Sequence, residues 1–187
     1  SGTLLRDQNQ ADSFKSVELR DYRMVLQGLV LVILVSPAFG SAAVIWPFMF
    51  IQLFAAFWGQ SLIAEHTSRF FGYHLPVNFD HPWKAHNIKE FWARWHRSMA
   101  QFVLRYIFLP LNLKGVSPKI ATVVAFVFMG IWHNLTLGYF AWGLCHGLLL
   151  AYGGDVSDNQ FRRTATRVLM WVVVISLSWF ANYGPVS

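Results

Sequence analysis

The chain has 187 residues, of which 55% are hydrophobic and only 13% are charged. Soluble domains carry about 25% charged residues, so this composition argues against a soluble globule and indicates a membrane protein. The formal net charge of +6 can suggest nucleic acid, but in so hydrophobic a chain anionic lipid headgroups or a negatively charged donor are the expected partners. We therefore predict no nucleic-acid partner.

The first residues look like a solvated loop or tail, because residues 1–23 mix charges of both signs. The chain opens with "SGTLLRDQ", without a methionine and without a visible signal peptide. We expect a single membrane domain over residues 1–187 that is the C-terminal part of a longer protein. The single cysteine, Cys145, lies in an apolar segment and gives no information on disulfides.

Long uncharged runs predict the membrane helices. Residues 24–64 contain no charged residue and no histidine, and "SPAFGSA" at residues 36–42 predicts a turn between two helices. Residues 120–153 predict two more helices with a break in "HNLTLG", and residues 166–183 predict the last one, after an exposed loop at 155–165. The shorter segments would span roughly 24 Å of a ~30 Å hydrocarbon core, so we expect tilted or re-entrant helices or a thinned bilayer. The predicted fold class is an all-α, polytopic integral membrane protein with interfacial amphipathic helices.

The polar centre of the chain, residues 65–98, leads into the segment "NIKEFWARWHRSMAQFVLRY". Asn87 predicts a helix cap there, and Glu90, three residues later, predicts a capping box. On one helix, four polar side chains would share a face and two interpretations stay open: a helix at the membrane surface, or a docking site for a phosphate-bearing donor. These four residues are Arg94, Arg97, Gln101 and Arg105. The apolar residues 99–113 suit an interfacial or broken helix, because they contain a charge and Pro110.

Neither a metal site nor a nucleophile is well supported. His81 and His86 are five positions apart, and His86 and Glu90 are four apart, but a zinc site needs a third close ligand and none has a suitable spacing. The chain also has no HxxxH or HxxHH box. Cys145 and His146 are adjacent, so on a helix their side chains point about 100° apart and cannot pair. There is no GxSxG elbow either. We predict no bound metal and no bound cofactor.

Isolated histidines remain as the candidates for chemistry. His133 and His146 lie at membrane depth, where ionisable residues are costly and usually functional, although each imidazole is also compatible with a structural role. His96 is nearer the surface and is compatible with an interfacial cluster. A single neutral imidazole suits acyl transfer from an activated thioester, since the reaction needs only a general base to take the hydroxyl proton.

Two separated motifs carry a family resemblance. The run "NFDHPWKAHNIKEFWARWHRSMAQFVLRYIFLPL", followed by "FMGIWHNLTLGYFAWGLCHG", resembles the membrane-bound O-acyltransferase (MBOAT) family, in its bacterial branch of alginate O-acetyltransferases and teichoic-acid D-alanyl transfer proteins. The resemblance implies a ring of helices around a thin centre with a tunnel. It places the family's near-invariant membrane histidine on His133, its second motif histidine on His96, and a third recurrent position, without an assigned role, on His146.

The chain departs from the usual family pattern at three places. Leu62 stands where an aspartate of a "YSD" motif is expected, Val77 stands where relatives have a glutamate, and Asn134 stands where glycine is commoner. These departures bear on subfamily and substrate more than on chemistry.

The leading hypothesis is a multi-pass O-acyltransferase of the inner membrane. It would move an acetyl or D-alanyl group from acetyl-CoA or an acyl carrier protein to a hydroxyl of a cell-surface polymer, alongside membrane lipid and other envelope-assembly proteins. In this hypothesis His133 is the general base and His96 binds or orients a substrate. The other expected substrate-binding residues are Trp92, Trp95, Arg94, Arg97, Trp132, Asn134 and His146.

Two alternative functions stay open. A non-catalytic transporter or export component also has intramembrane histidines, although it would more often pair buried ionisable groups with acids, and residues 91–154 contain none. A membrane oxidoreductase is disfavoured by the missing histidine boxes.

Overall fold

The computed structural model describes residues 17–35, 37, 48–153 and 160–183. Its regular structure is entirely helical in these ranges, which confirms the predicted all-α class. The chain divides into two compact units, Ser1–Ser41 with Ile51–Asn78 and Ala42–Phe50 with Phe79–Ser187. Each unit is described separately below.

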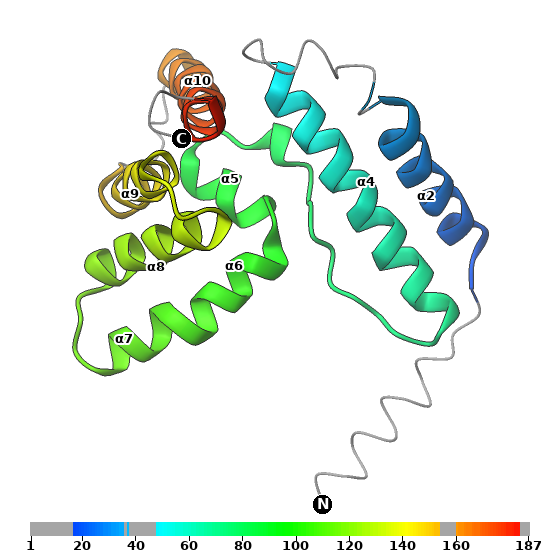
Figure 1. The fold of residues 1–187 in the computed structure, drawn as a ribbon, viewed down its shortest axis with the longest axis horizontal. Coiled ribbons are helices and arrows are strands. Elements are labelled where there is room, and N and C mark those ends of the chain that lie inside the picture. Colours follow the sequence, from blue (N-terminus) through cyan, green and yellow to red (C-terminus); the bar gives the residue numbers. More distant parts are fainter. Residues whose placement is uncertain (1–16, 36, 38–47, 154–159, 184–187) are drawn as a thin grey trace, which may run out of the picture. The chain divides into compact units, whose positions relative to one another are not determined.

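The first unit is built on two helices that run antiparallel, α2 (Leu19–Val30) and α4 (Phe48–Phe70) (Figure 1). A π-helical turn, Leu31–Val35, extends α2. The two helices touch backbone to backbone, because a Cβ atom on Gly28 would lie 2.6 Å from the carbonyl oxygen of Gly59, and one on Gly59 would lie 2.7 Å from that of Gly28. Any larger side chain at this crossing would force the helices apart.

A buried acid joins the start of α2 to the end of α4. The side chain of Asp21 is 3% exposed, and its Oδ1 lies 2.7 Å from His66 Nδ1 and accepts a hydrogen bond from Arg69 Nη1 at 3.0 Å. Burial opposes the ionisation of Asp21, but the hydrogen bonds from His66 and the Glu18 backbone and the charge of Arg69 outweigh it, so its pKa is lowered. The prediction of a solvated tail up to residue 23 is therefore wrong at its end. Helix α2 already begins at Leu19, and Asp21 in its first turn is buried. The partners of Asp21 lie 45 and 48 residues further along the chain, so the local sequence did not indicate this burial.

The segment after α4 is held against it by Asn78. The backbone N–H of Asn78 donates to Glu65 Oε1 at 2.6 Å, and its Nδ2 donates to Ser61 Oγ at 2.9 Å. Leu62, which stands where the family pattern has an aspartate, is buried in this unit, whereas Val77 is exposed. The buried acid of α4 is thus Glu65, one turn after Leu62.

The second unit contains the helices that carry the two motifs. They are α5 (Ile88–Arg94), α6 (Arg97–Val103), a π-helical turn (Leu104–Phe108), α7 (Leu109–Leu113), α8 (Pro118–His133), α9 (Leu137–Tyr152) and α10 (Gln160–Tyr183).

Helices α8 and α9 form a tight hairpin, which confirms the break predicted in "HNLTLG". Helix α8 ends at His133, and Thr136 caps α9 by accepting a hydrogen bond from the Tyr139 N–H at 3.3 Å. The two helices pack closely, since a Cβ atom on Gly143 would collide with the carbonyl oxygen of Phe126. The shortness of these helices follows the prediction, as each has 16 residues.

The described residues include one helix that is both long and apolar enough to cross a membrane, α10 with its window Thr164–Ala181. It begins at Gln160, six residues before the predicted start. Residues 38–47, with most of the predicted turn at 36–42, and residues 154–159, with the first five residues of the predicted loop at 155–165, lie outside the described residues. The other six residues of that predicted loop belong to α10, so the loop is shorter than predicted.

The prediction of one continuous helix after Asn87 is wrong. Asn87 does cap α5, with its Oδ1 accepting from the Glu90 N–H at 2.8 Å. However, Trp95 is extended and His96 has a left-handed backbone with φ 46°, so α5 ends and α6 starts in a new direction. Because a helix break separates Arg94 from Arg97, the predicted common helix face of the three arginines and Gln101 does not form. Arg105 is displaced further by the π-helical turn that contains it.

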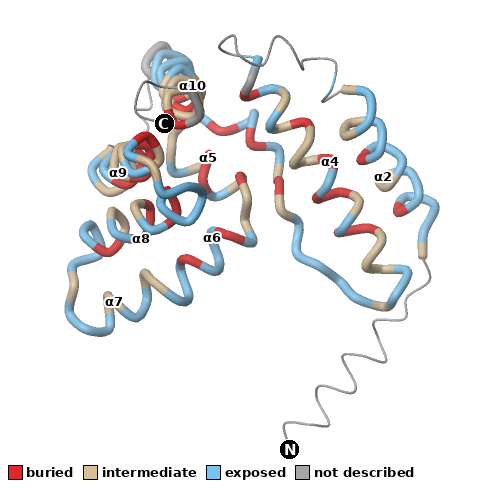
Figure 2. Tube along the Cα trace, viewed as in Figure 1, coloured by how far each residue is buried: buried red, intermediate tan, exposed pale blue. Residues whose placement is uncertain are grey.

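The core of the second unit is a cluster of aromatic rings around Trp95. Figure 2 shows buried residues in red along α5, α6, α8 and α9. Trp95 stacks on Phe50 and Phe91 with ring centroids 5.4 Å apart in both pairs, and Phe79 stands edge-on to it at 4.9 Å. Trp171 of α10 closes the cluster against Phe91 at 5.5 Å. The cluster fixes the end of α5, and with it the position of His96.

Candidate functional site: two imidazoles beside an apolar cavity

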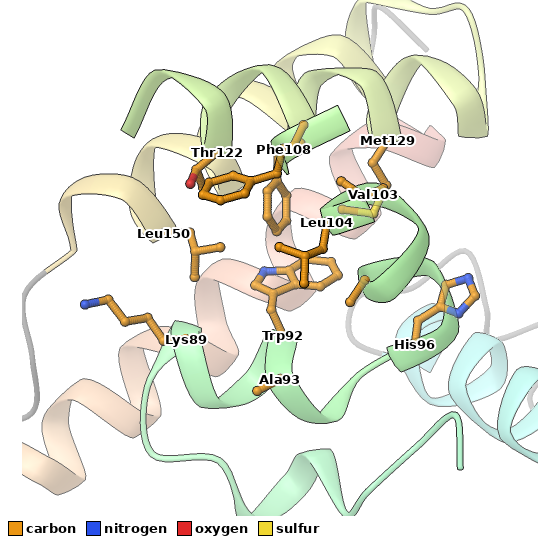
Figure 3. Close-up of a pocket in the computed structure, with 13 residues that line it drawn as sticks. Lys89, Trp92, Ala93, His96, Val103, Leu104, Phe108, Thr122, Met129 and Leu150 are labelled. Carbon is orange, nitrogen blue, oxygen red and sulfur yellow. The ribbon is translucent and has the colours of Figure 1, made fainter. Parts of the chain in front are cut away.

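A cavity of about 310 Å³ lies between α5, α6, the π-helical turn and α8 (Figure 3). One face of α5 forms its floor, because Lys89, Trp92, Ala93 and His96 follow the three- and four-residue spacing of a helix face. Lys89 and His96 stand at opposite ends of this row, and Trp92 projects between them (Figure 3). The rest of the lining is almost entirely apolar and includes Val103, Leu104, Phe108, Phe126, Met129 and Leu150.

His96 borders this cavity from the break between α5 and α6. Its left-handed backbone is uncommon for a residue with a side chain, and such strain is found most often at functional sites. The ring is half-buried, and its Nδ1 lies 3.4 Å from the Ser98 hydroxyl. Burial and, to a smaller extent, the charge of His133 together lower the pKa of His96 to about 4, so the imidazole is neutral at pH 7.

His133 is the last residue of α8, and three aromatic rings surround it. Trp132 and Trp142 stand edge-on to its imidazole at 5.0 and 5.8 Å, and Tyr139 lies at 5.8 Å. The sequence places this imidazole within an apolar run, but in the structure of this chain it is exposed. The reason is that the helix ends at His133, so the ring projects from the end of α8 instead of from its middle.

The fold brings the two motif histidines to the same place. They are 37 positions apart in the chain, and yet a charge on His133 is felt at His96 strongly enough to lower its pKa. Met129, one turn before His133 on α8, lines the cavity together with His96. His96 therefore lines the cavity directly, and His133 lies one turn beyond a residue that lines it, although His133 is not itself part of the lining.

His146 occupies a different position, deep between the helices. It is completely buried, and Trp92, Trp142 and Phe126 surround its ring at 5.2, 4.8 and 6.5 Å. Among the described residues, neither of its ring nitrogens has a hydrogen-bond partner, and the same holds for the buried indole N–H of Trp92. His146 is not among the residues that line the cavity, but two of its ring neighbours, Trp92 and Phe126, do line it, and Trp142 links it to His133.

The other predicted site residues divide into two groups. Trp92, Trp132 and Asn134 lie near the imidazoles: Trp92 lines the cavity, Trp132 contacts His133, and the exposed Asn134 ends α8 through its N–H bond to Gly130. Trp95 is instead part of the aromatic core.

The two arginines also differ from each other. Arg94 donates from Nη1 to the carbonyl oxygen of Asp80 at 3.2 Å and lies 3.6 Å from its carboxylate, so it fastens the segment before α5. Arg97 starts α6 beside His96, and its charge contributes to the lowered pKa of Asp80, after the hydrogen bond from His81 and the charge of Arg94.

Two residues of the site were missed from the sequence. Trp142 and Tyr139 precede His146 on α9 by four and seven positions, so they lie on the same face of that helix. That spacing could have placed both residues on the helix face of His146 from the sequence alone. In the structure, both rings contact His133. Within the described ranges, no three His, Cys, Asp or Glu side chains gather where they could hold a metal ion.

Comparison with known proteins decides the family. Residues 33–184, most of the chain, match the MBOAT, membrane-bound O-acyltransferase, family. The chain belongs to this family.

Three relatives show the branch of MBOAT proteins that the chain resembles. It is 33% identical over 136 residues to a peptidoglycan O-acetyltransferase of Helicobacter pylori, which covers 68% of this chain and 26% of the relative. It is 31% identical over 125 residues to a teichoic acid D-alanyltransferase of Streptococcus thermophilus, covering 62% and 29%, respectively. It is 32% identical over 116 residues to a Pseudomonas fluorescens protein named "Probable alginate O-acetylase AlgI", covering 60% and 23%. The chain thus spans roughly a quarter of the length of these relatives. The names of the relatives confirm the predicted bacterial branch.

Proposed function

We propose that this chain is the imidazole-bearing part of a multi-pass, inner-membrane O-acyltransferase that modifies a cell-surface polymer. The acyl group would be acetyl or D-alanyl, and the donor a thioester of coenzyme A or of an acyl carrier protein. The observation that carries the proposal is that His96 lines an apolar cavity, while His133, from a separate motif, lies close enough for its charge to lower the pKa of His96. The names of the relatives support transfer to a polymer, since they refer to peptidoglycan, teichoic acid and alginate.

His133 suits the role of general base in this reaction. The acceptor oxygen attacks the thioester carbonyl carbon, a C–O bond forms, and the C–S bond breaks to release the donor thiol. The proton of the acceptor hydroxyl passes to the imidazole of His133 and then to the departing sulfur, so the imidazole is regenerated. The exposure of His133 leaves it accessible to an acceptor, and the rings of Tyr139 and Trp142 orient it.

His96 suits the binding and orientation of a substrate. Since it is neutral at pH 7, it can donate one hydrogen bond and accept another. Most of the residues that line the cavity beside it are apolar, so the cavity favours binding of the uncharged part of a thioester donor. Arg97, next to His96 in the chain, would meet the anionic part of such a donor.

Acyl transfer by the full-length protein tests this proposal. His96→Ala and His133→Ala would each be compared with His74→Ala, which changes an exposed histidine of the first unit. We expect both site variants to lose transfer from the thioester donor at matched levels of membrane protein, while His74→Ala keeps it. Normal transfer by either site variant would contradict the proposal for that residue, and normal transfer by both would overturn the proposed site.

A further inference from the structure

A second hollow lies between α9 and α10, away from the two imidazoles. It is a groove of about 740 Å³, within the range of about 300 to 1,000 Å³ found for ligand pockets. One face of each helix forms its walls, because the lining residues recur at three- and four-residue spacing on both. They are Cys145, Leu148, Leu149, Tyr152 and Gly153 from the α9 side, and Val173, Ser176 and Leu177 from α10.

The groove is apolar and remains open to the surroundings. Leu148 and Leu149 are 44% and 38% exposed, although they belong to an apolar helix of a membrane protein family. Two of the lining residues, Cys145 and Ser176, have small side chains. In a bilayer, such a surface faces hydrocarbon chains.

One end of the groove carries a positive charge. Tyr152, which is 60% exposed, ends α9, and Lys119 Nζ stands 4.9 Å from the centre of its ring. Tyrosine and lysine at the end of a membrane helix mark the level of the lipid headgroups. Lys119 also lies in the first turn of α8, where the helix dipole already attracts negative charge and disfavours a cation. A local anion would offset this cost.

We propose that this groove binds an anionic phospholipid, with the phosphate at Lys119 and Tyr152 and one acyl chain along Leu148, Leu149 and Leu177. The site goes beyond the proposed acyl transfer, because none of its residues lines the cavity at His96. Charge complementarity at one end and an aliphatic lining along the rest favour a phospholipid over a second protein surface. The lipid is bound as a structural partner and is not consumed.

A photocrosslinking experiment on the full-length protein tests the site. Leu148 is replaced by photoreactive benzoylphenylalanine, and the protein is reconstituted in vesicles with equal amounts of phosphatidylglycerol and phosphatidylcholine that carry the same acyl chains. The control position is Leu169 of α10, which is 63% exposed and does not line the groove. Mass spectrometry of the adducts gives the ratio of the two lipids captured at each position.

We expect the groove position to capture phosphatidylglycerol about fivefold more often than the control position does, which is the preference that one lysine at the surface gives an anionic lipid. Lys119→Gln should bring the ratio down to that of the control, whereas Lys114→Gln, an exposed lysine in the turn before α8, should leave it unchanged. Equal ratios at Leu148 and Leu169, a preference that survives Lys119→Gln, or crosslinks to the protein itself would each overturn the proposal.

Discussion

Trp142 stands edge-on to His133, with the ring centroids 5.8 Å apart and the planes at 86°. The other side of the same indole packs on His146 at 4.8 Å. Trp142 is buried, so the hairpin of α8 and α9 fixes its position. Its contact with the exposed imidazole of His133 therefore restricts the orientation of that ring. A helix-end side chain would otherwise sample several rotamers.

The first prediction concerns this contact. Trp142→Leu, which keeps bulk but removes the ring, should lower kcat by about 10- to 100-fold with little change in KM, because a misplaced base costs rate and not binding. Trp142→Phe should retain most of the rate, since a ring still faces His133. Steady-state transfer kinetics of the purified full-length variants measure both. A Leu variant that folds and keeps its kcat would show that Trp142 does not position His133.

The second prediction concerns His146. His146→Ala should lower the free energy of unfolding by about 2 to 4 kcal/mol, because it opens a cavity inside a packed aromatic cluster. His146→Phe, which fills the space without nitrogen atoms, should recover most of that stability, since neither ring nitrogen has a partner among the described residues. Unfolding in detergent measures the difference. If the Phe variant is as unstable as the Ala variant, the nitrogens contribute through a polar group and the packing explanation fails.

How far the sequence predicts this site depends on which interactions are local. The break after His133 was predictable, because Asn134, Thr136 and Gly138 are residues that end and cap helices. The break at His96 was not, because "RWHRS" contains neither proline nor glycine. It arises where the aromatic core holds Trp95 in an extended conformation. The common arginine face was lost with that break.

Contacts between residues that lie far apart in the sequence could not be predicted from hydrophobic periodicity. The partners of Asp21 lie 45 and 48 positions away, so a charged N-terminal stretch looked like a solvated tail. The proximity of His96 to His133 was not predicted, because the family resemblance assigned each histidine to a motif without bringing the two together. By contrast, the apolar runs alone were enough to predict α8, α9 and α10, because membrane helices are set by hydropathy.

The third prediction follows from the lowered pKa of His96. Between pH 6.5 and about 4 the unfolded chain binds a proton at this residue that the folded chain does not, so folding stability should fall as the pH is lowered through that window. His96→Gln should remove this part of the pH dependence and leave the rest. Unfolding midpoints from pH 7 to pH 4.5 give the comparison. Parallel profiles for the two proteins would contradict the burial of a neutral imidazole.

The fourth prediction concerns Asp21. Asp21→Asn should destabilise the first unit by about 3 kcal/mol, because it leaves His66 and Arg69 without their buried anion. The pKa of Asp21 is lowered by folding, so its contribution is present above its ordinary value of 3.8 and is lost as the pH falls through the lower folded pKa. Arg20→Gln, an exposed neighbour, serves as the control. Equal stability of the Asp21 and Arg20 variants would refute the pairing.

The fifth prediction separates the two arginines. Arg94→Ala should lower stability by about 1 kcal/mol, since it removes the hydrogen bond to the Asp80 backbone, and should leave the KM for the donor nearly unchanged. Arg97→Ala should instead raise the KM for the donor without loss of stability. Donor titrations and unfolding of the two single variants distinguish these effects. The opposite pattern would move the donor contact to Arg94.

The central claim is that His133 takes the proton of the acceptor hydroxyl. The most direct measurement is acyl transfer by His133→Gln in the full-length protein, at matched membrane levels and with His133→Ala beside it. Glutamine retains a hydrogen-bonding side chain but cannot accept the proton, so we expect both variants to lose about 10² to 10⁴ in rate, the usual worth of general-base catalysis. Near-normal turnover by the glutamine variant would show that the site needs a hydrogen bond and not a base, and would contradict the mechanism.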